Sequence, residues 1–97
     1  MDRYEPPSDF LKSLIEDEGP LLGSEAEATF RRLIEMTCDK HPANRDWATL
    51  LLAQQDIDTP EVRSALLAAA GDENEYVRAE AILGLAQRDK ALALPLL

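Results

Sequence analysis

Few residues of this 97-residue chain combine the type and the spacing that chemistry requires. The only histidine, His41, lies beside a proline, and the sequence offers it no clear partners for a catalytic triad or a metal site. The only cysteine, Cys38, cannot form an internal disulfide, and we interpret it as a small buried residue near a helix end. Asp56 and Asp58 form an isolated D-x-D pair, which favours a solvated loop over a cation site. We therefore predict no catalytic residue, no metal site and no cofactor.

Aspartate and arginine do recur, and at a fixed spacing. Asp39 and Asp72 are 33 residues apart, as are Arg45 and Arg78. A carboxylate just before a helix can accept backbone N–H bonds and lies near the positive end of the helix dipole. Each arginine can reach the aspartate of its own or of the adjacent segment. We predict an Asp–Arg ladder with a structural role, formed by Asp39, Arg45, Asp72 and Arg78.

The same spacing relates two longer stretches of the chain. DKHPANRDWATLLLAQQD at 39–56 aligns without a gap with DENEYVRAEAILGLAQRD at 72–89. Small residues coincide at Ala48 and Ala81, and leucines coincide at Leu52 and Leu85. Self-similarity at this period indicates a solenoid, in which each helical hairpin buries its apolar face on an equivalent neighbour.

The elements that must position these residues are helices. Alanine and leucine dominate the apolar residues, which favours helix over strand. Ser8 and Ser24 are expected to cap the first two helices, Pro60 stands at a first helical position, and Gly19-Pro20 ends the first helix. Predicted helices cover 8–18, 24–39, 41–55, 59–71 and 74–88, and another begins at 91–97.

The second half of the chain resembles a known repeat. ALLAAAGDENEYVRAEAILGLAQRDKALALPLL is similar to the short HEAT-like repeats named after phycobilisome lyases, and the matching positions are Asp72, Val77, Arg78, Ala81, Gly84 and Leu85. The resemblance implies an all-α fold, a short right-handed α-solenoid of antiparallel helical hairpins with an N-terminal capping helix. The expected parts are an arm and capping helix at 1–23, repeats at 24–57 and 58–89, and the start of a third repeat at 90–97.

The resemblance also implies non-catalytic protein binding through the concave face, which the second helix of each hairpin lines. The residues expected there are Asp46, Trp47, Leu50, Gln54, Ala79, Glu80, Leu83 and Gln87. Trp47 is the predicted anchor of the interface, because its counterpart Glu80 suggests that this position need not be apolar for packing. The alternative interpretation is that Trp47 packs against the N-terminal segment or a neighbouring helix.

The net charge of −9 limits the partners. It disfavours nucleic acid and anionic membrane surfaces and permits a basic protein. One alternative function is therefore an acidic inhibitor of the immunity-protein type, which masks a basic partner. A second alternative function, which rests on the resemblance alone, is a bilin lyase or chromophore-handling protein.

The sequence shows no secretory signal and no membrane-spanning run, so we expect a cytoplasmic protein. The apolar ALALPLL at 91–97 could mediate self-association.

Overall fold

The computed structural model describes residues 6–16 and 26–96, and every regular element in these two ranges is a helix. The elements are α1 (Asp9–Glu16), α2 (Ala26–Met36), α3 (Pro42–Gln54), α4 (Pro60–Ala69), α5 (Glu75–Arg88), α6 (Lys90–Ala93) and the short 3₁₀ helix η1 (Leu94–Leu96). The prediction of an all-α fold is confirmed. The predicted helix end at Gly19-Pro20 and the predicted cap at Ser24 lie outside the described residues.

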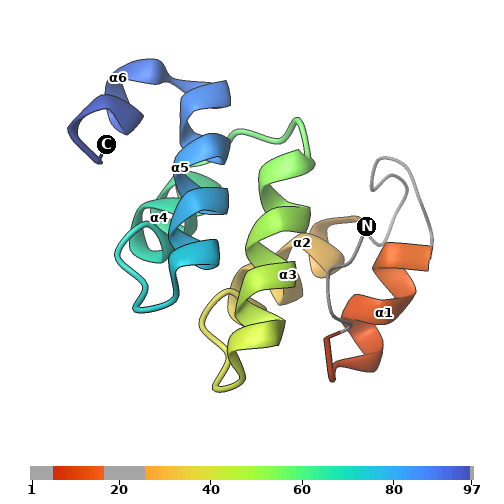
Figure 1. The fold of residues 1–97 in the computed structure, drawn as a ribbon. Helices are drawn as coiled ribbons and strands as arrows, with labels where there is room; N and C mark the ends of the chain where they lie inside the picture. The colour runs from red at the N-terminus through yellow and green to blue at the C-terminus, as the bar shows by residue number, and fades with distance from the viewer. Residues whose placement is uncertain (1–5, 17–25, 97) are drawn as a thin grey trace.

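The helices form two layers (Figure 1). The inner helices α1, α3 and α5 lie side by side, and the outer helices α2 and α4 lie behind them. Each outer helix packs on the inner helix that follows it, α2 on α3 and α4 on α5, while α3 and α5 make the most extensive contact between elements. These two hairpins fall within 24–57 and 58–89, the ranges expected for the two repeats, and α6 packs against α5 at the C-terminal end.

The helices begin where short polar side chains and prolines allow them to begin. Thr59 Oγ1 accepts a hydrogen bond from the N–H of Val62 at 3.2 Å, and Pro60 follows as the first residue of α4. Asn74 Oδ1 accepts the N–H of Tyr76 at 2.9 Å at the start of α5. Caps of this kind satisfy backbone donors that have no partner inside the helix.

Leucines at equivalent repeat positions form the centre of the core. Leu33 and Leu66 on the outer helices, and Leu52 and Leu85 on the inner helices, are all fully buried. Both pairs are 33 residues apart, so the sequence period is also the period of the packing. Burying each leucine contributes about 1.5–3 kcal/mol relative to leaving it exposed.

Gly84 lies where the inner helices α3 and α5 approach each other closely. A Cβ atom added there would lie 2.7 Å from the Cβ of Ala53 and 3.3 Å from Cδ1 of Leu66. Glycine inside a helix costs about 1 kcal/mol relative to alanine, and the close packing of the two repeats offsets that cost.

We predict that Gly84→Ala lowers the free energy of unfolding by about 1–3 kcal/mol, because overpacking outweighs the gain in helix propensity. Gly71→Ala is the matched control, because a Cβ at Gly71 would meet only a backbone oxygen of Ala68 at 3.6 Å. Urea denaturation followed by circular dichroism measures both changes. Equal stabilities for the two variants would contradict the tight approach at Gly84.

The first helix, α1, takes the position beside α3 that α3 itself takes beside α5 (Figure 1). Leu11 of α1 is fully buried and belongs to the same core cluster as Trp47 of α3. The backbone N–H of Ser8 donates to Oδ1 of Asn44 at 3.1 Å, which fixes the start of α1 against α3. The α1 helix therefore closes the N-terminal end of the layer of inner helices, as a capping helix must in a solenoid.

Candidate interaction surface

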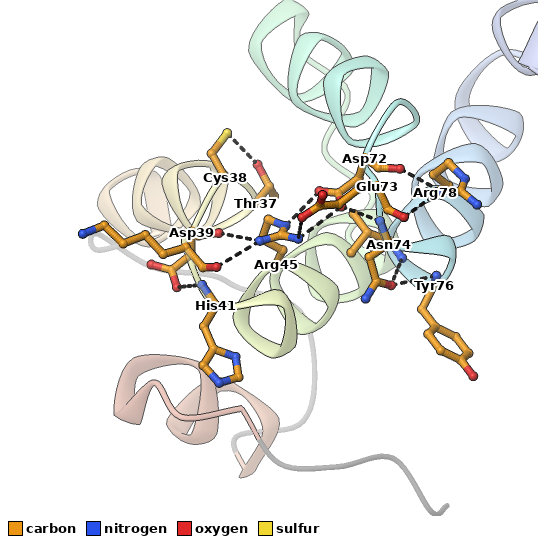
Figure 2. A network of polar contacts seen from close by, with 12 residues as sticks. Thr37, Cys38, Asp39, His41, Arg45, Asp72, Glu73, Asn74, Tyr76 and Arg78 are labelled. Atoms are coloured by element: carbon orange, nitrogen blue, oxygen red, sulfur yellow. Dashed lines mark hydrogen bonds and ion pairs between the residues drawn. The ribbon is translucent and has the colours of Figure 1, made fainter.

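Arg45 joins the two repeats at their interhelical turns (Figure 2). Its Nη1 donates to the carbonyl oxygens of Asp39 at 3.0 Å and Lys40 at 3.2 Å, within its own repeat. Its Nε and Nη2 donate to the two carboxylate oxygens of Asp72, in the next repeat, at 2.9 and 3.3 Å. This fork-to-fork geometry is the strong form of an arginine–carboxylate pair. The predicted ladder is therefore formed between Arg45 and the aspartate of the adjacent repeat.

Arg78 makes the same contacts within its own repeat as Arg45 does. Its Nη1 donates to the carbonyl oxygens of Asp72 at 2.9 Å and Glu73 at 3.0 Å, the counterparts of the two carbonyls that Arg45 contacts (Figure 2). The two arginines are therefore held by their own turns in the same way. They differ in that Arg45 also binds a carboxylate from the repeat that follows.

The ladder aspartates organise the turns that precede the inner helices. Asp39 Oδ2 accepts hydrogen bonds from Nδ2 of Asn44 at 2.9 Å and from the N–H of His41 at 3.0 Å. The hydrogen bond from Asn44 has the largest effect, and together the two bonds lower the pKa of the Asp39 carboxyl below its usual range. Asp72 Oδ1 accepts the N–H of Asn74 at 2.8 Å in the same way. The N-capping residue itself lies two positions further along in both repeats, at His41 and Asn74.

We predict a measurable coupling between Arg45 and Asp72. Both side chains are only 12% exposed, so the pair is largely shielded from water. A double-mutant cycle with Arg45→Gln and Asp72→Asn should give a coupling free energy of about 1–3 kcal/mol that changes little with salt.

The exposed pair of Arg31 and Glu27, with side chains 70% and 87% exposed, is the matched control for this cycle. Its coupling should be about 0.3–0.5 kcal/mol and should fall with added salt. A coupling between Arg45 and Asp72 no larger than that of the control pair would mean that the ladder does not hold the repeats together.

A set of exposed side chains follows one face of α5, and we call it the α5 ridge: Tyr76, Ala79, Leu83 and Gln87. Tyr76 is 58% exposed and Leu83 is 55% exposed. Glu80, beside this ridge, is half-buried. Tyr76 was not among the predicted surface residues, although its position seven residues before Leu83 places both on one helix face.

The corresponding face of α3 is largely covered, which corrects the prediction for two residues. Asp46 is 1% exposed and Trp47 is 9% exposed, so neither forms part of an open concave surface. The reason is the position of α1, which packs on α3 and places Leu11 in the same cluster as Trp47. Towards the C-terminal end of α3, Leu50 is half-buried and Gln54 is exposed, so these two residues extend the open surface.

Arg88 makes a second set of hydrogen bonds between the repeats, after that of Arg45, which the sequence analysis did not predict. We call it the Arg88 clamp. Its guanidinium reaches from the end of α5 to the end of α3 and donates to the carbonyl oxygens of Leu52 (3.2 Å), Ala53 (3.3 Å), Gln55 (2.7 Å), Ile57 (2.8 Å) and Gly84 (2.9 Å). Burial lowers the pKa of Arg88. The clamp satisfies carbonyl groups that a helix C-terminus leaves without partners. The available signal was a basic residue in the last turn of α5.

The remaining residues considered for a chemical role are a histidine, an aspartate and a cysteine, and the first two make local structural contacts. His41 caps α3, accepting the N–H of Ala43 on Nδ1 at 3.1 Å, and Asp58 pairs with Arg63 at 2.7 Å. Cys38 is exposed, so its predicted burial is wrong. The reason is that α2 ends at Met36 and leaves this residue in the turn.

Within 6–16 and 26–96, no group of three or more His, Cys, Asp or Glu side chains could hold a metal ion. None of the helices described there is both long and apolar enough to cross a membrane.

Alternating outer and inner helices, capped at one end and stacked through repeated Arg–Asp and leucine positions, define an α-solenoid. The family model described as HEAT repeats matches residues 30–97, and the chain belongs to this family. The comparisons with curated proteins and with solved structures gave no match. The resemblance seen in the sequence is thereby confirmed at the level of HEAT repeats.

Proposed function

We propose that this chain is a non-catalytic protein-binding module whose contact surface is the α5 ridge. One observation carries the proposal: Tyr76 and Leu83, a large aromatic and a large aliphatic side chain, are each more than half exposed on the same face of one helix. HEAT repeats commonly serve as protein-interaction scaffolds, and their inner helices supply the contact surface.

The spacing of the ridge suits a protein partner. Tyr76 and Leu83 are two helical turns apart, about 10.5 Å along the axis. Ala79 lies between them, so a partner side chain can approach the helix closely there. Gln87 lies one turn beyond Leu83 and adds hydrogen-bonding capacity. An apolar centre with a polar edge is the usual composition of an interface.

The open end of α3 continues this surface. Leu50 and Gln54 are the repeat counterparts of Leu83 and Gln87, and α3 packs directly on α5. A partner that contacts the ridge can therefore contact both repeats. The buried Asp46 and Trp47 would support this surface from beneath without touching the partner.

The negative charge around the α5 ridge favours a basic partner. The second candidate function is therefore an acidic inhibitor that masks a basic protein. Glu73 has a side chain that is 90% exposed, Glu75 is exposed at the start of α5, and Glu80 borders the ridge. The chain as a whole carries a net charge of −9. An affinity that falls steeply with added salt would indicate a basic partner, whereas an affinity that is insensitive to salt would indicate an apolar one.

The experiment compares Leu83→Glu with the wild type. A partner is first isolated by affinity capture on the wild-type chain and purified, and its dissociation constant is then measured by titration calorimetry. A charge placed at the centre of the contact should weaken binding at least thirtyfold, which corresponds to about 2 kcal/mol.

Leu67→Glu is the matched control, because Leu67 is a 43% exposed leucine on the outer helix α4. This substitution introduces the same charge on the outer face, outside the proposed contact surface. The variant should therefore bind the partner as tightly as the wild type does. If Leu83→Glu bound the partner as tightly as Leu67→Glu does, the α5 ridge would not be the contact surface.

A further inference from the structure

A groove opens between the outer helices α2 and α4, and we call it the α2–α4 groove. The contact between these two helices is far less extensive than that between α3 and α5, so space remains between them. The groove has a volume of about 570 Å³, which lies within the usual range of ligand-binding clefts. Its apolar lining consists of Phe30, Ile34, Ile57 and Val62.

One lining residue, Ile57, comes from a linker that the second repeat lacks. Residues 55–59 join α3 to α4, whereas a single residue joins α5 to α6. Contacts on both sides hold this linker: Nη2 of Arg88 donates to the carbonyl oxygen of Ile57 at 2.8 Å, and Asp58 pairs with Arg63 at 2.7 Å. The groove is therefore preformed, so a ligand does not have to order the linker when it binds.

The apolar lining of the groove is only partly covered by the protein itself. Phe30, Ile34 and Ile57 pack against the core cluster, and each of them remains half-buried. Val62, in contrast, is 1% exposed. A bulky aliphatic side chain from another molecule would remove the remaining apolar surface from water, which favours binding.

The charged residues of the groove favour a cation beside that aliphatic group. Glu27 on α2 and Glu61 on α4 line the groove, and both are exposed. Arg31 also lines it and pairs with Glu27 at 3.3 Å, but such an exposed pair contributes little and does not prevent a second cation from approaching. Among the described lining residues, two carboxylates thus accompany one guanidinium, and the whole chain carries a charge of −9.

We infer that the α2–α4 groove binds an extended segment of a partner protein in which a large aliphatic side chain stands next to a lysine or an arginine. The aliphatic side chain would cover Phe30, Ile34 and Ile57, and the basic side chain would pair with Glu61. A second copy of this chain is a poor occupant, because two chains that each carry a charge of −9 repel one another. The inference does not depend on the α5 ridge, and the control position Leu67 does not line the groove.

The first test selects a ligand without assuming its sequence. Random dodecapeptides displayed on phage are selected for binding to the immobilised full chain at low salt. We expect the enriched peptides to share a large aliphatic residue within two positions of a lysine or an arginine. Enrichment of acidic peptides, or no enrichment at all, would overturn the inference.

The second test locates the most enriched peptide on the protein. The chain has four isoleucines, so ¹³C labelling of their Cδ1 methyl groups gives four signals in a methyl spectrum. The peptide should shift the signals of Ile34 and Ile57 and leave those of Ile15 on α1 and Ile82 on α5 unchanged. A shift confined to Ile82 would place the peptide on α5 and show that the groove is not its site.

Substitutions then test the two parts of the recognition. Glu61→Arg should raise the dissociation constant of the peptide at least tenfold, because it places a positive charge where the basic side chain binds. Ile57→Ala, with its fold verified by circular dichroism, should also raise the dissociation constant at least tenfold, because it removes apolar lining.

Asp9→Arg is the matched control for the charge reversal. Asp9, like Glu61, is an exposed carboxylate in the first turn of a helix, but it lies on α1, so its reversal should change the dissociation constant less than twofold. Equal affinities of the Glu61→Arg and Asp9→Arg variants would contradict the assignment. So would a wild-type dimer in sedimentation velocity that Glu61→Arg dissociates, because the occupant would then be a second copy.

Discussion

Trp47→Ala should lower the free energy of unfolding by about 3–5 kcal/mol, because it removes a large aromatic side chain from a packed core. Trp47 is 9% exposed and clusters with Leu11, Leu52 and other core residues. Domains of this size are stable by about 5–15 kcal/mol in total, so the variant should be close to unfolded at 37 °C. Thermal and urea denaturation followed by circular dichroism measure the change without the tryptophan signal.

Trp47→Phe is the control for this prediction. It keeps an aromatic ring between α1 and α3 and removes less volume, so its cost should be well below that of Trp47→Ala. A destabilisation by Trp47→Ala of less than about 1 kcal/mol, the range typical of surface substitutions, would show that α1 does not cover this residue.

Arg88→Met should cost about 2–4 kcal/mol, because it leaves the carbonyl groups at the end of α3 without their charged donor. Methionine retains the apolar stem of the side chain, so the loss reports on the hydrogen bonds rather than on packing. The guanidinium donates to Gln55 at 2.7 Å and to Ile57 at 2.8 Å, both in the segment that follows α3. Urea denaturation gives the magnitude, and faster amide hydrogen exchange at the end of α3 would locate the effect.

Two comparisons make this prediction specific. Arg88→Lys keeps the charge, but a single ammonium group cannot span the same set of carbonyls, so it should recover only part of the stability. Arg63→Met removes an arginine that pairs with Asp58 and Asp89 near the surface, and its effect should be smaller than that of Arg88→Met. Equal effects of Arg63→Met and Arg88→Met would contradict the clamp.

The features that repeat in the sequence were predictable from the sequence. Leu33 and Leu66, and Leu52 and Leu85, share a period, and the structure buries all four. Helix starts were also predictable, because caps and N-terminal prolines act over a few residues, as at Thr59. An Asp–Arg ladder also followed from the same period, but the sequence left open whether each arginine reaches the aspartate of its own or of the adjacent repeat, and the structure shows the adjacent one for Arg45.

The features that depend on the ends of the array were not predictable in the same way. Comparing Trp47 with Glu80 assumed equal surroundings, but the inner helix that precedes α3 in the layer is α1, whereas the one that precedes α5 is α3. The sequence did predict a capping helix at 8–18 and left open that Trp47 packs against it, but the repeat comparison gave no means of choosing between that packing and an exposed Trp47. The Arg88 clamp was missed because its counterpart is Gln55, so the repeat comparison gave no sign of a charged contact there.

Site-specific photo-crosslinking at the α5 ridge tests the central claim most directly. A photoreactive phenylalanine analogue replaces Leu83 in one sample and Leu67 in another, and both proteins are irradiated in the source cells. The two positions are exposed leucines on the inner helix α5 and the outer helix α4. Our account predicts a discrete crosslinked partner from position 83 and none from position 67. A partner captured only from position 67 would place the interaction on the outer face and contradict the account.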